Sequence, residues 1–243
     1  MMGVIAEEFR QIACYESDIF GKLLPTAAMN YFQEVSTNQG IALGIGADYL
    51  RQKHLAWFLV KYDIRFDKIP DYGSQVRITT EATGMDRYCA VRQFKITDLD
   101  HNNLIVANTQ WLLINTENQK MESVENHPEF SAYDCFEKKE PIFRKLSRLK
   151  MASASKKIEV RFLDIDFNNH VNHVKYLAWA IEALPMEIVK TRTLKQAKIV
   201  FKEQCFYGDE VEVLSELIDE NIYGIEIMNQ NQKLLCQLEL ILK

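Results

Sequence analysis

The sequence lacks the features that would place the protein in a membrane or outside the cell. No apolar run approaches the roughly 20 residues that a membrane-spanning helix needs, and the N-terminus has no basic region followed by a long apolar one. The five cysteines are widely spaced and form no C-x-x-C pair, which is typical of reduced thiols in a cytosolic protein. We therefore expect a cytoplasmic protein.

An excess of positive charge is also missing. The chain has 29 Lys and Arg against 34 Asp and Glu, a net charge of −5, which argues against a nucleic-acid partner bound through bulk positive charge. His54, His101, His127 and His173 show no metal-ligand spacing and no H-E-x-x-H motif, so we expect no metal. Hydrophobic residues make up 47% of the 243 positions, which is enough for a sizeable buried core.

The pattern of apolar and turn residues predicts an α+β protein with antiparallel sheets. Runs rich in β-branched and aromatic residues, separated by turn residues, predict two sets of strands, each accompanied by a helix. The first set has a helix at 26–38 and strands at 9–17, 57–66, 74–84, 88–98 and 104–115. The second has a helix from Val171 to Leu184, ended by Pro185, and strands at 158–162, 196–202, 211–217, 222–228 and 233–242.

The two halves repeat one another. Asp18 and Glu34 recur as Asp166 and Glu182 at an offset of 148 residues. At an offset of 135 residues, Ile64, Phe66, Gly73 and Val76 recur as Ile199, Phe201, Gly208 and Val211. This predicts two copies of one helix-plus-sheet unit, with extra loop in the first copy around 40–54. Glu34 and Glu182 are either buried acids beside the helices or surface residues.

The predicted domains are 1–133 and 157–243, joined by a basic linker at 134–156. Between Phe136 and Lys157 positive charges outnumber negative ones, which is typical of a solvated linker or of a docking surface for an acidic partner. In the second interpretation Lys145, Arg148 and Lys150 are the candidate docking residues.

One polar segment stands out as a candidate for catalysis. Asp166, Asn168 and His170 occupy alternate positions, and in an extended segment alternate side chains share one face. The apolar helix pattern begins at Val171, so His170 is expected at a helix start, where free N–H groups and the helix dipole favour a developing oxyanion. This arrangement suits acyl-transfer chemistry. The first copy has Phe20 and Lys22 at the places of Asn168 and His170, so we expect a single active site.

A second polar group, Gln204 and Cys205, precedes the turn at Gly208. An imidazole near a thiol can lower the thiol pKa and make it a nucleophile, or the imidazole can activate a water molecule. Purely structural interpretations remain open: Asp166 or Asn168 as a turn or helix-cap residue, His170 as a structural histidine, and Cys205 as a small buried residue.

The run from Leu163 to Tyr176, followed by Trp179, resembles the D-x-N-x-H-V-N-x-V-K-Y run of the acyl-ACP thioesterase family. Trp57, the stretch from Arg92 to Phe94, and Trp111 resemble the same family. The resemblance implies two tandem hotdog units, each an antiparallel sheet wrapped around a helix, that form an intramolecular pseudo-dimer. The first unit would be catalytically degenerate and shape the acyl-chain pocket, and the second would be catalytic.

The resemblance also implies the reaction and its residues. The expected activity is hydrolysis of the thioester of fatty acyl-acyl carrier protein, which releases a free fatty acid. The partner would be acyl carrier protein, the state monomer or homodimer, and no cofactor would be needed beyond the 4′-phosphopantetheine that the substrate carries. The implied catalytic residues are Asp166, Asn168, His170, Gln204 and Cys205, with Trp57 binding substrate.

At Gln204 the chain departs from the family pattern, which has a Glu there. A carboxamide cannot accept a proton as a base, so the departure favours His170 as the base. Two other functions remain open: a hotdog thioesterase that acts on acyl-CoA, and a non-catalytic protein that binds acyl thioesters.

Overall fold

The computed structural model describes residues 3–135 and 142–243, and these fold into two compact units. The division falls between Phe143 and Arg144. Of the predicted linker 134–156, residues 136–141 lie outside the described residues, and residues 144–156 belong to the second unit. In the part of the chain that is described, no helix is both long and apolar enough to cross a membrane.

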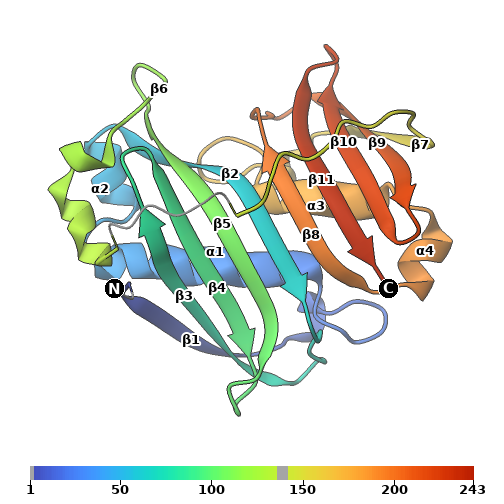
Figure 1. The fold of residues 1–243 in the computed structure, drawn as a ribbon, viewed down its shortest axis with the longest axis horizontal. Helices are drawn as coiled ribbons and strands as arrows, with labels where there is room; N and C mark the ends of the chain where they lie inside the picture. The colour runs from blue at the N-terminus through green and yellow to red at the C-terminus, as the bar shows by residue number, and fades with distance from the viewer. Residues whose placement is uncertain (1–2, 136–141) are drawn as a thin grey trace. The chain divides into compact units, whose positions relative to one another are not determined.

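The first unit is an antiparallel sheet packed against one long helix (Figure 1). Its elements are β1 (Ile5–Gln11), α1 (Pro25–Ala42), α2 (Ala47–Gln52), β2 (Leu55–Phe66), β3 (Gln75–Met85), β4 (Cys89–Thr97), β5 (Asn103–Asn115) and the short β6 (Lys120–Met121). The strands pair in the order β1-β3-β4-β5-β2, and β6 pairs with β5. The extra loop predicted around 40–54 carries α2.

The periodicity of the sequence explains why these elements pack together. Pro25 occupies the first turn of α1, where its missing N–H costs nothing. Alternate residues of β3, such as Val76 and Ile78, are buried beneath the helix. Phe32 of α1 stacks on Phe94 of β4 with ring centroids 5.0 Å apart. This wrapping of a sheet around a helix is the hotdog arrangement that the sequence predicts.

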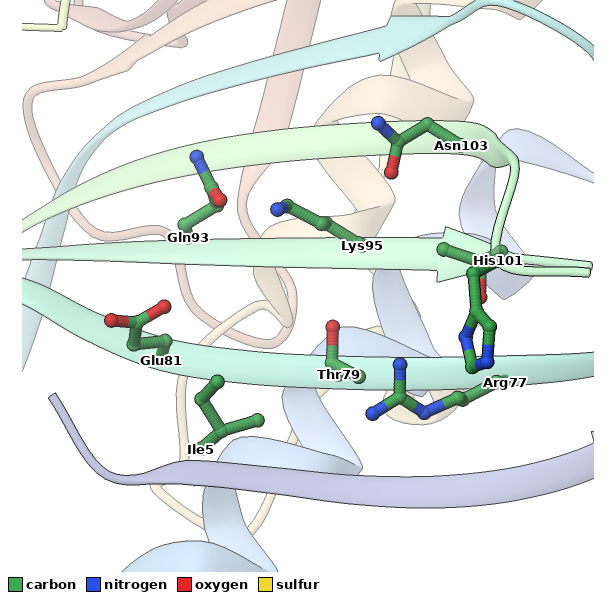
Figure 2. A pocket seen from close by; sticks show the side chains of 9 residues that line it. Ile5, Arg77, Thr79, Glu81, Gln93, Lys95, His101 and Asn103 are labelled. Carbon is green, nitrogen blue, oxygen red and sulfur yellow. The ribbon is translucent and has the colours of Figure 1, made fainter. Parts of the chain in front are cut away.

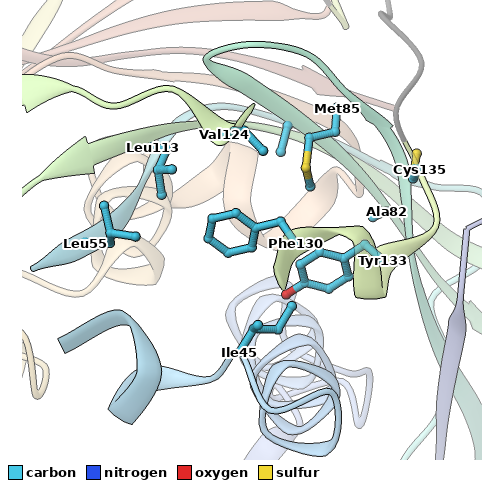
Figure 3. Packing of buried hydrophobic residues seen from close by; sticks show 10 residues of the cluster. Ile45, Leu55, Ala82, Met85, Leu113, Val124, Phe130, Tyr133 and Cys135 are labelled. Carbon is cyan, nitrogen blue, oxygen red and sulfur yellow. The ribbon is translucent and has the colours of Figure 1, made fainter. Parts of the chain in front are cut away.

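A second group of buried residues fills the first unit beside α2 and the 3₁₀ helix Pro128–Tyr133 (Figure 3). At its centre lies Phe130, which is fully buried. The ring of Trp57 packs against Phe130 with centroids 5.3 Å apart, and Tyr49 meets Phe130 edge-on at 6.0 Å. Trp57, the predicted substrate contact, is therefore an edge member of this apolar cluster.

The second unit repeats the plan of the first. Its elements are β7 (Ala154–Glu159), α3 (His173–Glu182), α4 (Met186–Thr191), β8 (Leu194–Phe201), β9 (Glu210–Asp219), β10 (Ile222–Asn229) and β11 (Leu234–Leu242). The strands pair antiparallel in the order β7-β9-β10-β11-β8, with α3 against the sheet. Each strand thus has a counterpart at the same place in the first sheet, which confirms the predicted repeat.

The basic stretch before β7 is held on the second sheet. Glu226 of β10 is buried, and its carboxylate accepts hydrogen bonds from the Arg148 guanidinium and, at 3.2 Å, from the Leu149 N–H. The Lys150 N–H donates to Glu216 at 2.7 Å. The Arg148 guanidinium is therefore paired with Glu226 within the unit, although the Arg148 side chain is itself exposed. Lys145, Arg148 and Lys150 all have exposed side chains, and their docking role stays a prediction.

Some predicted boundaries are wrong. The first strand covers 5–11 and not 9–17, because residues 14–16 form a 3₁₀ turn. The helix predicted from Val171 begins at His173 and ends at Glu182. Glu34 and Glu182 are both exposed, and Glu182 pairs with Lys156 at 3.1 Å. These two repeated acids are therefore surface residues.

Candidate functional site

The predicted catalytic segment forms a tight chain reversal between β7 and α3. Ile165 and Val171 pair as an isolated antiparallel bridge, and the Asp166 N–H donates to the His170 carbonyl at 2.9 Å. The Asp166 carboxylate accepts the Asn168 N–H at 2.8 Å. Asp166 and His170 thus lie opposite each other across the turn, and Asn168 lies exposed at its tip. The segment is not extended, so the alternation predicted from the sequence is wrong as the reason why these residues lie close together. The chain reversal brings them together instead.

A second loop, residues 202–209, is tied to this turn at its base. The Val171 N–H donates to the Cys205 carbonyl at 2.9 Å. The imidazole of His170 lies edge-on against the ring of Phe206, with centroids 5.2 Å apart. Asp209 fixes the loop, since its carboxylate accepts the Phe206 N–H at 2.9 Å. The structure therefore brings His170 and the loop of Gln204 and Cys205 together, as predicted, although Gln204 itself is exposed.

Cys205 has the surroundings of a structural residue. Its side chain is fully buried, and its thiol lies 3.5 Å from the Asp209 carboxylate. Burial, and then the nearby Asp209 charge, raise the pKa of the Cys205 thiol to about 12. A thiol with this pKa is protonated at neutral pH and is a poor nucleophile. Of the two alternatives drawn from the sequence, the one in which an imidazole lowers the Cys205 pKa is therefore not supported, and activation of a water molecule by the imidazole stays open.

Asp164 is the main residue that the sequence did not indicate. Its carboxylate is fully buried and accepts the Arg161 N–H at 3.0 Å and the Arg161 guanidinium at 3.1 Å, with Lys175 at 3.2 Å. Burial alone would raise the pKa of Asp164, but the bonds from Arg161 and Lys175 outweigh it and lower that pKa. Because its carbonyl also accepts the Asn172 N–H at 2.9 Å, Asp164 joins the turn to α3.

Helix α3 begins three residues beyond His170. Asn172 is the N-cap, and its side chain accepts the Val174 N–H at 3.0 Å, while its carbonyl accepts the Lys175 N–H at 2.9 Å. These two N–H groups are thus engaged by Asn172 and are not open to a substrate oxygen; the oxyanion site at the helix start stays a prediction. Asn168 is not a cap.

Burial lowers the pKa of His173, the first residue of α3, to about 4.

The first unit has the same turn without the Asn and His side chains. The Asp18 N–H donates to the Lys22 carbonyl at 2.8 Å, and the Asp18 carboxylate accepts the Phe20 N–H at 2.8 Å. The Leu23 N–H donates to the Pro70 carbonyl at 3.0 Å, as Val171 does to Cys205. Where the second unit sets His170 against Phe206, the first has an ion pair between Lys22 and Asp71. The same turn is therefore used with and without a candidate catalytic histidine.

A separate cavity of about 190 Å³ lies on the outer face of the first sheet (Figure 2). Polar side chains from β3 and β4 line it, among them Arg77, Glu81 and Lys95, with His101 from the following turn. None of the predicted site residues lines this cavity. Within 3–135 and 142–243, no three or more His, Cys, Asp or Glu side chains are grouped so that they could hold a metal ion.

Comparison with known proteins identifies the same family over both units. The acyl-ACP thioesterase N-terminal domain model matches residues 4–132, and the acyl-ACP thioesterase C-terminal domain model matches residues 147–243. An oleoyl-acyl carrier protein thioesterase of Coriandrum sativum is 24% identical over 239 residues, covering 90% of this chain. This chain spans 65% of the length of that protein and 52% of an acyl-[acyl-carrier-protein] hydrolase of Cuphea viscosissima.

Two solved structures have the same fold. The 12:0-ACP thioesterase of Umbellularia californica superposes with a TM-score of 0.88 at 18% identity, covering 100% of this chain and 98% of its own. An acyl-ACP thioesterase of Bacteroides thetaiotaomicron superposes with a TM-score of 0.84 at 21% identity, covering 98% of each chain. These likenesses establish two tandem hotdog units in one chain.

Proposed function

Because the chain belongs to the acyl-ACP thioesterase family, we propose that it hydrolyses the thioester of fatty acyl-acyl carrier protein and releases a free fatty acid. The observation that carries the proposal is the turn in the second unit, which holds Asp166, Asn168 and His170 within a match to the C-terminal family domain. The partner is an acyl carrier protein. The five cysteines form no disulfide, which supports a reducing compartment such as the cytoplasm.

The chemistry needs one base and one hydrogen-bond donor. His170 removes a proton from a water molecule as its oxygen attacks the thioester carbonyl carbon. The exposed Asn168 carboxamide donates a hydrogen bond to the carbonyl oxygen, which becomes negative in the tetrahedral intermediate. The carbon–sulfur bond then breaks, and the departing thiolate takes the proton from the His170 imidazolium. Water supplies the nucleophile and the substrate carries its own arm, so no cofactor is required.

The other predicted residues take supporting roles. Asp166 holds the turn through its bond to the Asn168 N–H. Cys205 supports the turn through its carbonyl, and its raised pKa argues against a covalent acyl-cysteine route. The Gln204 side chain can bind a water molecule or substrate oxygen but cannot take a proton.

Gln204 favours one alternative, a protein that binds acyl thioesters without turning them over. The two functions are separated by measuring free-thiol release from acyl-acyl carrier protein by the wild type, His170→Ala and Cys205→Ala. We expect turnover by the wild type and by Cys205→Ala, with a loss of about 10² to 10⁴ in kcat for His170→Ala. Saturable binding by the wild type without thiol release would establish the non-catalytic alternative.

The same assay on acyl-CoA tests the other alternative. A kcat/KM for acyl-CoA equal to that for the carrier-protein thioester would make the protein a general acyl-thioester hydrolase. The variant Gln204→Glu restores the carboxylate of the family pattern. Because we assign the base to His170, we expect its kcat to stay within a few-fold of the wild type.

A further inference from the structure

Five large apolar side chains surround the candidate catalytic turn and face solvent. We define the apolar rim as Phe162, Leu163, Phe167, Phe206 and Tyr207. Their exposed fractions are 76%, 80%, 71%, 46% and 68%, so they are not part of the core. Scattered exposed apolar residues are common, but a group of them beside a functional site usually marks a binding surface.

Rim residues of the two loops that form the site meet each other. Phe162, in the 3₁₀ turn Phe162–Asp164, meets Tyr207 of the second loop edge-on with ring centroids 6.4 Å apart. Phe206 contacts His170 at 5.2 Å. The rim therefore begins at the candidate base itself and extends outward from it.

Charges beside the rim are largely balanced within the unit. Lys233 pairs with Glu203 at 2.8 Å, and Lys157 pairs with Glu210 at 3.6 Å. Arg161 is engaged by the buried Asp164. A surface with this balance has little to attract a strongly acidic partner by charge, so its recognition must be mainly apolar.

We propose that the apolar rim binds the pantetheine arm that delivers the thioester, on acyl carrier protein. This inference rests on the proposed function. The sulfur of the arm is bonded to the carbon that His170 must reach, so the arm has to lie against the residues that adjoin His170. A fatty acyl chain on so exposed a surface would stay in water, which is unfavourable. The arm, with a dimethyl group between amides, suits an exposed aromatic surface with polar edges.

The first unit provides a matched control. Tyr15 and Tyr72 occupy the repeat positions of Leu163 and Tyr207, at the offsets of 148 and 135 residues. They are also exposed, at 81% and 60%, but the turn between them carries Lys22 in place of His170. Replacing them removes the same kind of surface from a place where we expect no arm.

The experiment measures binding of two non-hydrolysable probes, palmitoyl-pantetheine amides carried by acyl carrier protein and by CoA. Leu163→Ser/Tyr207→Ser should raise the Kd of both probes about tenfold, as expected for losing two apolar contacts at an interface. Tyr15→Ser/Tyr72→Ser should change neither Kd by more than about twofold. Thermal unfolding of each variant checks that the fold is retained.

Several outcomes would overturn the assignment. If both double variants lost the same affinity for the probes, the effect would not be specific to the rim. A loss with the carrier-protein probe alone would place the contact on the carrier protein and not on its arm. Unchanged probe binding, together with rim-dependent binding to phosphatidylglycerol vesicles, would make the rim a membrane contact.

The failure of this inference can be told apart from that of the proposed function. If the wild type binds the amide probes through the rim but releases no thiol from the corresponding thioester, the proposed enzyme function is wrong. The assignment of the rim is then still supported. If the wild type hydrolyses the thioester but the rim variants bind both probes normally, the proposed function is supported and the assignment of the rim is wrong.

Discussion

The Asp166 carboxylate accepts a hydrogen bond from the backbone N–H of Asn168 at 2.8 Å and so closes the turn in which His170 lies. Asp18 makes the same bond to Phe20 in the first unit. Because both units make this bond, we propose that Asp166 acts on catalysis by anchoring the turn.

This relationship predicts how substitutions at Asp166 behave. Asp166→Ala should cost about 1 kcal/mol of unfolding free energy, because it removes one turn hydrogen bond, and should lower kcat by loosening His170. Asp166→Asn keeps an acceptor oxygen and should retain most activity. Asp18→Ala removes two such bonds, from the Phe20 and Lys22 N–H groups, so it should lose at least as much stability, with kcat unchanged. Urea unfolding and thiol-release assays measure both quantities, and an inactive Asp166→Asn would show that the carboxylate charge itself is required.

The raised pKa of Cys205 predicts slow alkylation. At pH 8 the Cys205 thiol should be almost entirely protonated, because its pKa is about 12, and its burial blocks reagents as well. Iodoacetamide should therefore modify the exposed Cys14 first, with Cys205 protected until the protein unfolds. Mass spectrometry of the labelled peptides follows both sites. Rapid labelling of Cys205 in the folded protein, with loss of thiol release, would revive a covalent mechanism.

The buried carboxylate of Asp164 predicts a large stability effect at the base of the site. Asp164→Asn removes the charge that faces Arg161 and Lys175 and should cost about 2 kcal/mol, less than for a fully buried ion pair because Arg161 is exposed. Its pKa is lowered in the folded state, so this contribution is present above the unfolded pKa and is lost as pH falls below about 4.

Glu16 is the matched control for Asp164, at the repeat offset of 148 residues. Its carboxylate accepts the Ala13 N–H at 3.0 Å and the Tyr31 hydroxyl, both neutral donors. Glu16→Gln should therefore cost less, about 1 kcal/mol. Denaturant unfolding near pH 7 and pH 3 compares the two variants, and equal losses of unfolding free energy for Asp164→Asn at the two pH values would contradict the charge argument.

The lowered pKa of His173 predicts that the free energy of unfolding falls in mild acid. Burial lowers its folded pKa to about 4 from the usual 6.5, so the unfolded chain binds the proton more readily between these values. Stability is full above pH 6.5 and should fall by about 3 kcal/mol as pH drops to 4. The difference between wild type and His173→Gln isolates this slope, since other acids titrate in both. A pH-independent difference would mean that His173 is not buried in its neutral form.

The strands could be predicted from the sequence because alternation and β-branched residues specify them locally. The strand expected at 57–66 is observed at 55–66, and that expected at 222–228 at 222–229. The turn that holds Asp166, Asn168 and His170 could not be predicted in the same way. Alternating polar residues fit a strand and a reversal equally well, and the reversal depends on backbone bonds and on the positive φ of Asn169, 65°.

Neither the start of α3 nor the role of Asp164 could be predicted from the sequence, and the reasons differ. Asn168, Asn169 and Asn172 are all competent N-caps, so the sequence alone does not identify Asn172 as the cap. A fully buried carboxylate is unusual, so Asp164 was not expected to be structural. The repeat offset that aligns it with Glu16 was available and would have indicated a shared role.

The two turns have the same backbone hydrogen bonds but carry different side chains. In the first unit the same hydrogen bonds are made around Asp18, with Lys22 and Asp71 at the places of the imidazole and its aromatic neighbour. A gene duplicate with such a frame can lose catalysis in one copy by drift at two or three positions without unfolding. The same frame makes the first unit a natural recipient for an engineered second reactive centre.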